Sequence, residues 1–78
     1  MSERPGWAPI YTPADLGHFL RDLRMQEGLT QAQLADELGV TRQYVLALET
    51  GKANLYSDRL FQALRLLGGH LRAQGPGR

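Results

Sequence analysis

The side chains that could do covalent or metal chemistry are few in this 78-residue chain, and they are widely spaced. Cysteine is absent, which excludes a disulfide framework and a thiolate zinc site. His18, His70, Ser57 and the acidic residues have no spacing typical of a nucleophile, a general base or a metal site. We therefore expect a protein that is not an enzyme, with no catalytic residue, no metal ligand and no cofactor.

The basic residues show a more informative pattern, although the formal net charge is only +1. Residues 1–40 carry three arginines and six acids, whereas residues 41–78 carry six basic residues and two acids. A concentration of positive charge in one half suits the neutralisation of nucleic-acid phosphates. Ordinary scatter of surface charge explains the same distribution, so both interpretations stay open on this pattern alone.

The boundary between the two halves falls inside residues 28–51, which predict two short helices joined by a tight turn. Thr30, with a glutamine three residues later, is the capping-box pattern of a helix start, and Gly39 supplies a stop. Thr41 is the N-cap candidate of the second helix, which Gly51 ends. Apolar residues recur at helical spacing in both segments. Two helices of about two turns around a glycine-containing turn predict a helix-turn-helix unit.

The stretch TQAQLADELGVTRQYVLALETGK, residues 30–52, resembles the DNA-binding core of the Xre/Cro-type repressors. The marks of that core are T-Q-x-x-L-A, then L-G-V-[ST], then a helix ending in [IVL]-x-x-[ILV]-E-x-G-K, and all of them are present. The resemblance implies a lambda-repressor-like domain whose second helix lies in the major groove of DNA.

What the resemblance implies about DNA contacts centres on the start of that second helix. Arg42 could donate two hydrogen bonds to guanine, and Gln43 could pair with adenine. Tyr44 and Leu46 depart from the small polar residues common in the family, so they either meet thymine methyls and sugar edges or weaken direct base reading. The resemblance further implies that Gln31 bonds a phosphate and that Lys52 contacts the DNA backbone. The implied DNA-binding residues are therefore Gln31, Thr41, Arg42, Gln43, Tyr44, Leu46, Ala47 and Lys52.

The resemblance also implies one structural ion pair. Arg24 and Glu49 match a pair that, in those repressors, ties the end of the first helix to the end of the recognition helix. The guanidinium fork fits a carboxylate geometrically. At Lys52, an ordinary solvated lysine is the alternative to a contact with the DNA backbone.

Two further helices complete the expected bundle. Thr12 and Pro13 begin the first with the residues favoured at the N-cap and first helical positions, and Gly28 ends it. Ser57 is the cap candidate of the last, which Gly68 ends. We expect an all-α, helix-turn-helix bundle of about four helices over residues 12–68, preceded by an extended arm over residues 1–11 and followed by a strand and disordered tail over residues 69–78.

The last helix and the segment after it predict a dimer interface. The helix has more apolar residues than one face needs, and Phe61 and Leu66 point partly away from the main stripe. The segment HLRAQ is compatible with one edge strand, which needs a partner and would find it in a second copy across a two-fold axis. A snug intramolecular core is the alternative for the helix. The expected interface residues are Phe61, Leu66, His70, Leu71 and Arg72.

The wider layout resembles the HipB-type antitoxins nearly end to end. In that group the C-terminal strands pair across the dimer, and the protein represses its own operon and binds a kinase-like toxin. The resemblance thus implies a homodimer on palindromic operator DNA, with a HipA-like kinase toxin as a further partner. A stand-alone repressor of phage, plasmid or host genes is the first alternative. An interaction adaptor that has lost DNA binding is the second.

The chain carries no apolar run of membrane-spanning length, and its start lacks the basic and apolar regions of a signal peptide. We therefore expect a soluble protein of the bacterial cytoplasm with no membrane partner. A chain of this length buries only a modest core, which makes a dimer or another partner plausible.

Overall fold

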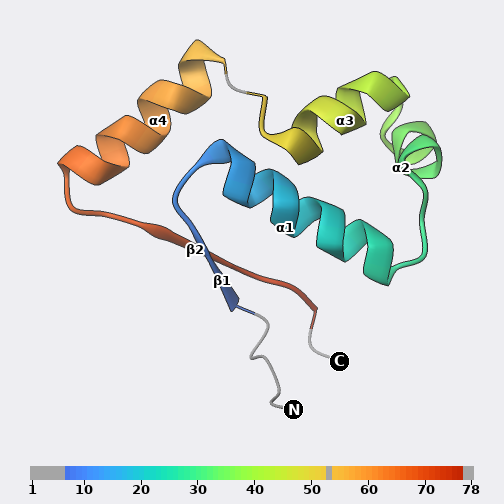
Figure 1. The fold of residues 1–78 in the computed structure, drawn as a ribbon, viewed down its shortest axis with the longest axis horizontal. Helices are drawn as coiled ribbons and strands as arrows, with labels where there is room; N and C mark the ends of the chain where they lie inside the picture. The colour runs from blue at the N-terminus through green and yellow to red at the C-terminus, as the bar shows by residue number, and fades with distance from the viewer. Residues whose placement is uncertain (1–6, 53, 77–78) are drawn as a thin grey trace.

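The computed structural model describes residues 7–52 and 54–76, which form four helices and a two-stranded sheet (Figure 1). Residues 1–6 of the expected arm and 77–78 of the expected tail lie outside the described residues. The described elements follow one another as β1 (Trp7–Ile10), α1 (Pro13–Gln26), α2 (Gln31–Leu38), α3 (Arg42–Thr50), α4 (Leu55–Leu66) and β2 (Leu71–Gln74). Helices α2 and α3 are the predicted helix-turn-helix pair.

The helix starts follow local capping, as predicted for α1, α2 and α3. The hydroxyls of Thr12, Thr30 and Thr41 each accept a hydrogen bond of 3.0 Å from the backbone N–H three residues later. The prediction for α4 was wrong, because its cap is Asn54 and the helix begins three residues early. The Ser57 N–H donates to the Asn54 side chain (2.9 Å), and the Ser57 hydroxyl accepts from the Asn54 N–H (3.3 Å). Both residue types cap helices, so composition alone did not separate them.

Two glycines let α1 cross close to the end of α3. Gly17 is buried, and a Cβ atom there would overlap the backbone carbonyl groups of Leu48 and Glu49. Gly51 ends α3 with φ +68°, a left-handed conformation that favours glycine, and a Cβ on it would overlap the backbone of Ala14. The two helices therefore meet backbone to backbone, which sets how deeply α3 is seated on α1.

The two strands form an antiparallel ribbon beside α1, on the side away from the helix-turn-helix pair (Figure 1). Trp7 pairs with Gln74 and Ile10 with Leu71, and the buried Ile10 anchors the ribbon to the core. The guanidinium of Arg72 lies 4.9 Å from the centre of the Trp7 ring, within the range of a cation–π interaction.

The ribbon adds to two sequence predictions. A strand forms near the C-terminus, and within the chain its partner is β1, while pairing of strands between two copies stays a prediction. The expected arm is likewise regular strand over Trp7–Ile10. Pro9 conceals this strand in the sequence, because proline has no backbone N–H and is tolerated only on edge strands. In a two-stranded ribbon both strands are edges, so the proline is accommodated.

The interface prediction was also wrong for Phe61. Its side chain is only 5% exposed and belongs to the buried core with Ile10, Ala35 and Val45. Leu66, the other surplus apolar residue of α4, is 78% exposed. The intramolecular packing considered as an alternative therefore accounts for Phe61 but not for Leu66.

The close crossing of α1 and α3 generates a first prediction. Gly17→Ala should lower the free energy of unfolding by about 1–3 kcal/mol, because the new methyl group meets backbone atoms that cannot rotate away. This loss outweighs the gain of up to about 1 kcal/mol that alanine brings to a helix. Thermal unfolding should show a melting temperature lower by about 4–8 °C per kcal/mol.

Gly69→Ala is the matched control, because its Cβ would lie 3.4 Å from Leu64 Cδ2, an ordinary van der Waals contact. Its melting temperature should stay close to that of the native protein. A Gly17→Ala protein as stable as the native one would show that α1 and α3 can separate without cost.

Candidate nucleic-acid interface

The first two turns of α3 present a row of exposed side chains. Thr41, Arg42, Gln43 and Leu46 are exposed, and Tyr44 is 55% exposed. On the opposite side of the same helix Val45 and Glu49 are buried, so helical periodicity separates an anchored face from a free one. Within the described residues, no side-chain hydrogen bond or ion pair engages Arg42 or Gln43. Their donors are therefore available to a ligand.

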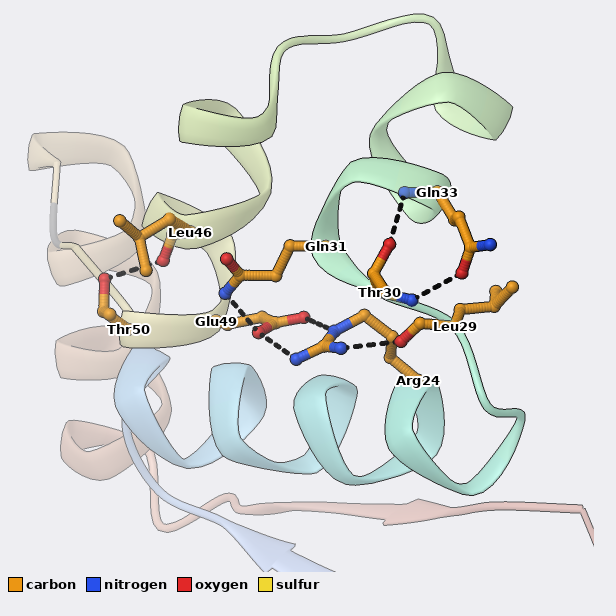
Figure 2. Close-up of polar contacts among 8 residues, drawn as sticks. All are labelled: Arg24, Leu29, Thr30, Gln31, Gln33, Leu46, Glu49 and Thr50. Atoms are coloured by element: carbon orange, nitrogen blue, oxygen red, sulfur yellow. Dashed lines mark hydrogen bonds and ion pairs between the residues drawn. The ribbon is translucent and has the colours of Figure 1, made fainter.

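The anchored face is fixed by an ion pair between α1 and α3 (Figure 2). Arg24 Nε donates to Glu49 Oε2 at 2.5 Å, and Arg24 Nη2 donates to Glu49 Oε1 at 3.1 Å. The third guanidinium nitrogen, Nη1, donates to the Leu29 carbonyl at 2.7 Å. The two side chains are 11% and 2% exposed, so the pair is largely removed from water. A bidentate fork of this kind fixes both the distance and the angle between the helices.

Gln31 joins the same cluster, which sequence reasoning missed. Its Nε2 donates to Glu49 Oε1 at 3.1 Å, and its side chain is half-buried at the start of α2 (Figure 2). A side-chain amide has two N–H donors and a carbonyl oxygen, so this bond leaves hydrogen-bonding capacity for a phosphate. The contact joins residues 18 positions apart, and no local pattern indicates it. All three helices α1, α2 and α3 thus meet at one carboxylate.

The cluster holds both charges in their ionised forms. Hydrogen bonds from Arg24 lower the pKa of the Glu49 carboxyl, against the opposing effect of burial, and the bond from Gln31 lowers it further. The hydrogen bond to Glu49 correspondingly raises the pKa of Arg24. Among the described residues Glu49 is the one buried charged residue, and both of its carboxylate oxygens accept hydrogen bonds.

Lys52 and Ala47 lie at the rim of the exposed row. The Lys52 N–H donates to the Ala47 carbonyl at 3.0 Å across Gly51, which closes the C-terminus of α3. The Lys52 side chain is exposed, whereas Ala47 is half-buried. The structure thus places the eight predicted DNA-binding residues on α3 and its two ends and at the start of α2. Gln31 and Ala47 are the two that are partly covered.

Other chemistry has little support in the described residues. Residues 7–52 and 54–76 contain no group of three His, Cys, Asp or Glu side chains arranged to hold a metal ion. His18 and His70 are exposed, the first on α1 and the second in the segment between α4 and β2. No helix in these residues has the length and apolar character needed to cross a membrane.

A short helix presented by a second short helix, with its outer face free, defines a helix-turn-helix protein, and the comparisons agree. The Helix-turn-helix domain family model matches residues 15–74. The chain is 35% identical over 68 residues to the uncharacterized HTH-type transcriptional regulator y4mF of Sinorhizobium fredii. These aligned residues cover 87% of this chain and 90% of that protein. An uncharacterized HTH-type transcriptional regulator of Methanothermobacter thermautotrophicus is 47% identical over 47 residues, 60% of this chain and 64% of that protein. No solved structure matches. The chain therefore belongs to the helix-turn-helix domain family.

The buried carboxylate generates a prediction about pH. Because the pKa of Glu49 is lower in the folded protein than in the unfolded chain, folding releases a proton in the intervening pH range. Stability from this group is therefore complete above the unfolded pKa, about 4.3, and is lost as the pH falls through the folded value. Urea unfolding should give a lower free energy of unfolding at about pH 3.5 than at about pH 7, with a weaker pH dependence in Glu49→Gln.

Glu49→Gln should also lower the free energy of unfolding near neutral pH, because it leaves the Arg24 charge without its ionic partner. Glu37→Gln, which changes an exposed carboxylate on α2, is the control and should keep the native pH dependence. If Glu49→Gln responded to acid just as the native protein does, Glu49 would not be the group responsible.

Proposed function

We propose that this protein is a sequence-specific DNA-binding transcriptional regulator that acts by binding and not by catalysis. The observation that carries the proposal is the free row of Arg42, Gln43 and Tyr44 at the start of a helix whose opposite face is locked by Glu49. Donors at the N-terminal end of such a helix reach base edges in the major groove. A rigid support keeps the entropic cost of ordering them low on binding. The family and both named relatives point the same way.

The finer proposal is a repressor that works as a homodimer. Helix α3 has nine residues and is about 14 Å long, so one copy spans only a few base pairs. Two copies with recognition helices about 34 Å apart would read a palindromic operator. Exposed apolar residues at the end of α4 support this proposal, since Leu66 is 78% and Leu67 is 85% exposed. Burying them in a second copy would remove apolar surface from water.

The ribbon offers a second element for the proposed dimer. Strand β2 is paired on one side only, so its other edge carries unpaired backbone donors and acceptors. Pairing of this edge with its own copy across a two-fold axis would give a four-stranded sheet. His70, Leu71 and Arg72 are exposed at this place, so with Leu66 they remain the proposed interface residues.

The antitoxin function is the most specific form of the proposal. It rests on the resemblance of the layout to HipB-type antitoxins, namely an extended N-terminal segment, a helix starting at Thr12-Pro13, the helix-turn-helix pair, one further helix and a C-terminal strand. The protein would then act in the bacterial cytoplasm, repress its own operon and bind a HipA-like kinase toxin. Co-expression with the product of the adjoining gene tests this step, and the lack of a complex with a kinase-like protein would favour a stand-alone repressor.

Two substitutions should separate base reading from phosphate binding. Arg42→Ala should cost about 1–3 kcal/mol on the operator upstream of the gene and far less on random DNA, because a base contact carries specificity. Lys52→Ala should weaken binding to both DNAs equally and reduce the slope of log K against log salt by about 0.9, because one phosphate contact is lost. Fluorescence anisotropy at several salt concentrations measures both effects.

Equal losses of Arg42→Ala on the operator and on random DNA would make Arg42 a phosphate contact. An unchanged salt slope in Lys52→Ala would leave Lys52 as a solvated side chain. If the native protein binds no DNA, the adaptor alternative replaces the regulator.

Dimerisation is tested by Leu66→Asp, which places a charge where the apolar contact is proposed. Since Leu66 is exposed in the single chain, the variant should keep its helicity but sediment as a monomer at micromolar concentration and lose operator footprinting. Met25→Asp, at an exposed position on α1, is the control and should remain a dimer. Truncation before β2 would be a poor test, because it also removes the partner of β1. A monomeric native protein would refute the interface.

A further inference from the structure

An apolar groove of about 390 Å³ lies where α1, α3 and α4 meet. Leu16 and Leu20 of α1, Tyr44 and Leu48 of α3, and Leu60 and Phe61 of α4 contribute to its walls. Its volume falls within the range typical of small-molecule sites. In Figure 1, α4 diverges from α1 and α3. Leu16, Leu48 and Leu60 keep substantial exposure there.

The polar groups of the groove define what could enter it. Asn54 and Ser57 are occupied with each other in the capping box of α4. The groups left over are the Tyr44 hydroxyl and the Lys52 ammonium, and Lys52 is the one charged residue among the described lining residues. Since no acidic side chain among them balances it, charge complementarity favours an anionic group beside an apolar body.

The volume favours a small molecule over a docked helix. A helix with its side chains is about 10 Å across, so a single 5.4 Å turn already occupies roughly 400 Å³. The groove thus has room for no more than one turn of a partner. The strongly exposed residues Leu66 and Leu67, proposed above for the dimer contact, do not line it.

We propose that this groove binds a small organic acid with an aromatic or aliphatic body, whose carboxylate pairs with Lys52, and that this ligand is an effector of DNA binding. The regulatory part rests on the proposed function, whereas the binding itself does not. Tyr44, Ala47 and Lys52 both line the groove and belong to the proposed DNA-binding set. A carboxylate on Lys52 competes with phosphate for the same charge. The ligand therefore lowers the affinity for DNA.

Binding is tested with phenylbutyrate as the probe and phenylbutanol as its uncharged counterpart. The full chain is titrated with phenylbutyrate while NMR monitors the backbone amides. The signals of Leu48, Lys52 and Leu60 should shift and saturate at about millimolar probe. Phenylbutanol should bind more weakly, and Lys52→Gln should lower the affinity for phenylbutyrate by about threefold, as expected for a partly exposed ion pair.

Two variants fill the groove, and one control does not. Leu16→Trp and Leu60→Trp add bulk from α1 and α4, and either should abolish the saturable shifts while circular dichroism shows native helicity. Met25→Trp changes an exposed residue of α1 outside the groove and should bind phenylbutyrate as the native protein does. Two positions are used because one of them could unfold the chain.

The effector role is tested by measuring operator affinity at physiological salt with and without saturating phenylbutyrate. The affinity should fall by about fivefold, because the loss of one phosphate contact, with its slope of about 0.9, has this effect at physiological salt. The operator affinity of Leu16→Trp should not change when phenylbutyrate is added. If phenylbutyrate binds in the groove but leaves the operator affinity unchanged, the effector role is overturned. A native chain that binds phenylbutyrate but no DNA would refute the proposed function while the groove site stands.

Three results would overturn the site itself. The first is the absence of saturable shifts in the native chain. The second is equal affinity for phenylbutyrate and phenylbutanol, because the site would then not select an acid. The third is a set of shifts at the groove that grows with protein concentration in the absence of probe, because a second copy would then be the occupant.

Discussion

The buried contact between Arg24 and Glu49 is the interaction on which the arrangement of this domain depends. Helices α2 and α3 have eight and nine residues, lengths at which an isolated helix is marginal in water. Their orientation must therefore come from tertiary contacts. An apolar seam would hold them together but would let them slide, whereas the guanidinium fork and the bond from Gln31 fix direction as well as distance. Breaking such a pair leaves a buried charge uncompensated, which strongly disfavours alternative packings.

The ion pair and the glycine crossing act on the same end of α3. Gly17 and Gly51 bring the backbones of α1 and α3 into contact, and the backbone of Glu49 is part of the contact at Gly17. Val45 and Glu49 anchor one face of α3, so the opposite face, which carries Arg42 and Gln43, makes no packing contacts that bury it. That division explains how a nine-residue helix can be both rigid and exposed at Arg42 and Gln43.

Local capping signals predicted the helices well, whereas contacts between residues far apart in the chain could not be predicted from the sequence. Thr12, Thr30 and Thr41 determine helix starts through atoms three residues away, so the sequence contains the whole interaction. The pairing of β1 with β2 joins the two ends of the chain, and Pro9 hides one partner from any strand pattern. Phe61 was misassigned for a related reason, because its burial depends on how α4 meets α1, which no period along α4 encodes.

The shape of the domain follows from this distribution of contacts. The chain forms a plate of 37 × 36 × 16 Å, and α4, which is fixed chiefly through Phe61, leaves apolar surface on two sides. Leu66 and Leu67 at its end are exposed and do not line the groove, whereas Leu60 does. These two surfaces make different demands. The proposed dimer contact would hold two recognition helices at a fixed spacing, while the proposed ligand would act on Tyr44 and Lys52 within one copy. Because the residues are distinct, substitutions can test the two proposals separately.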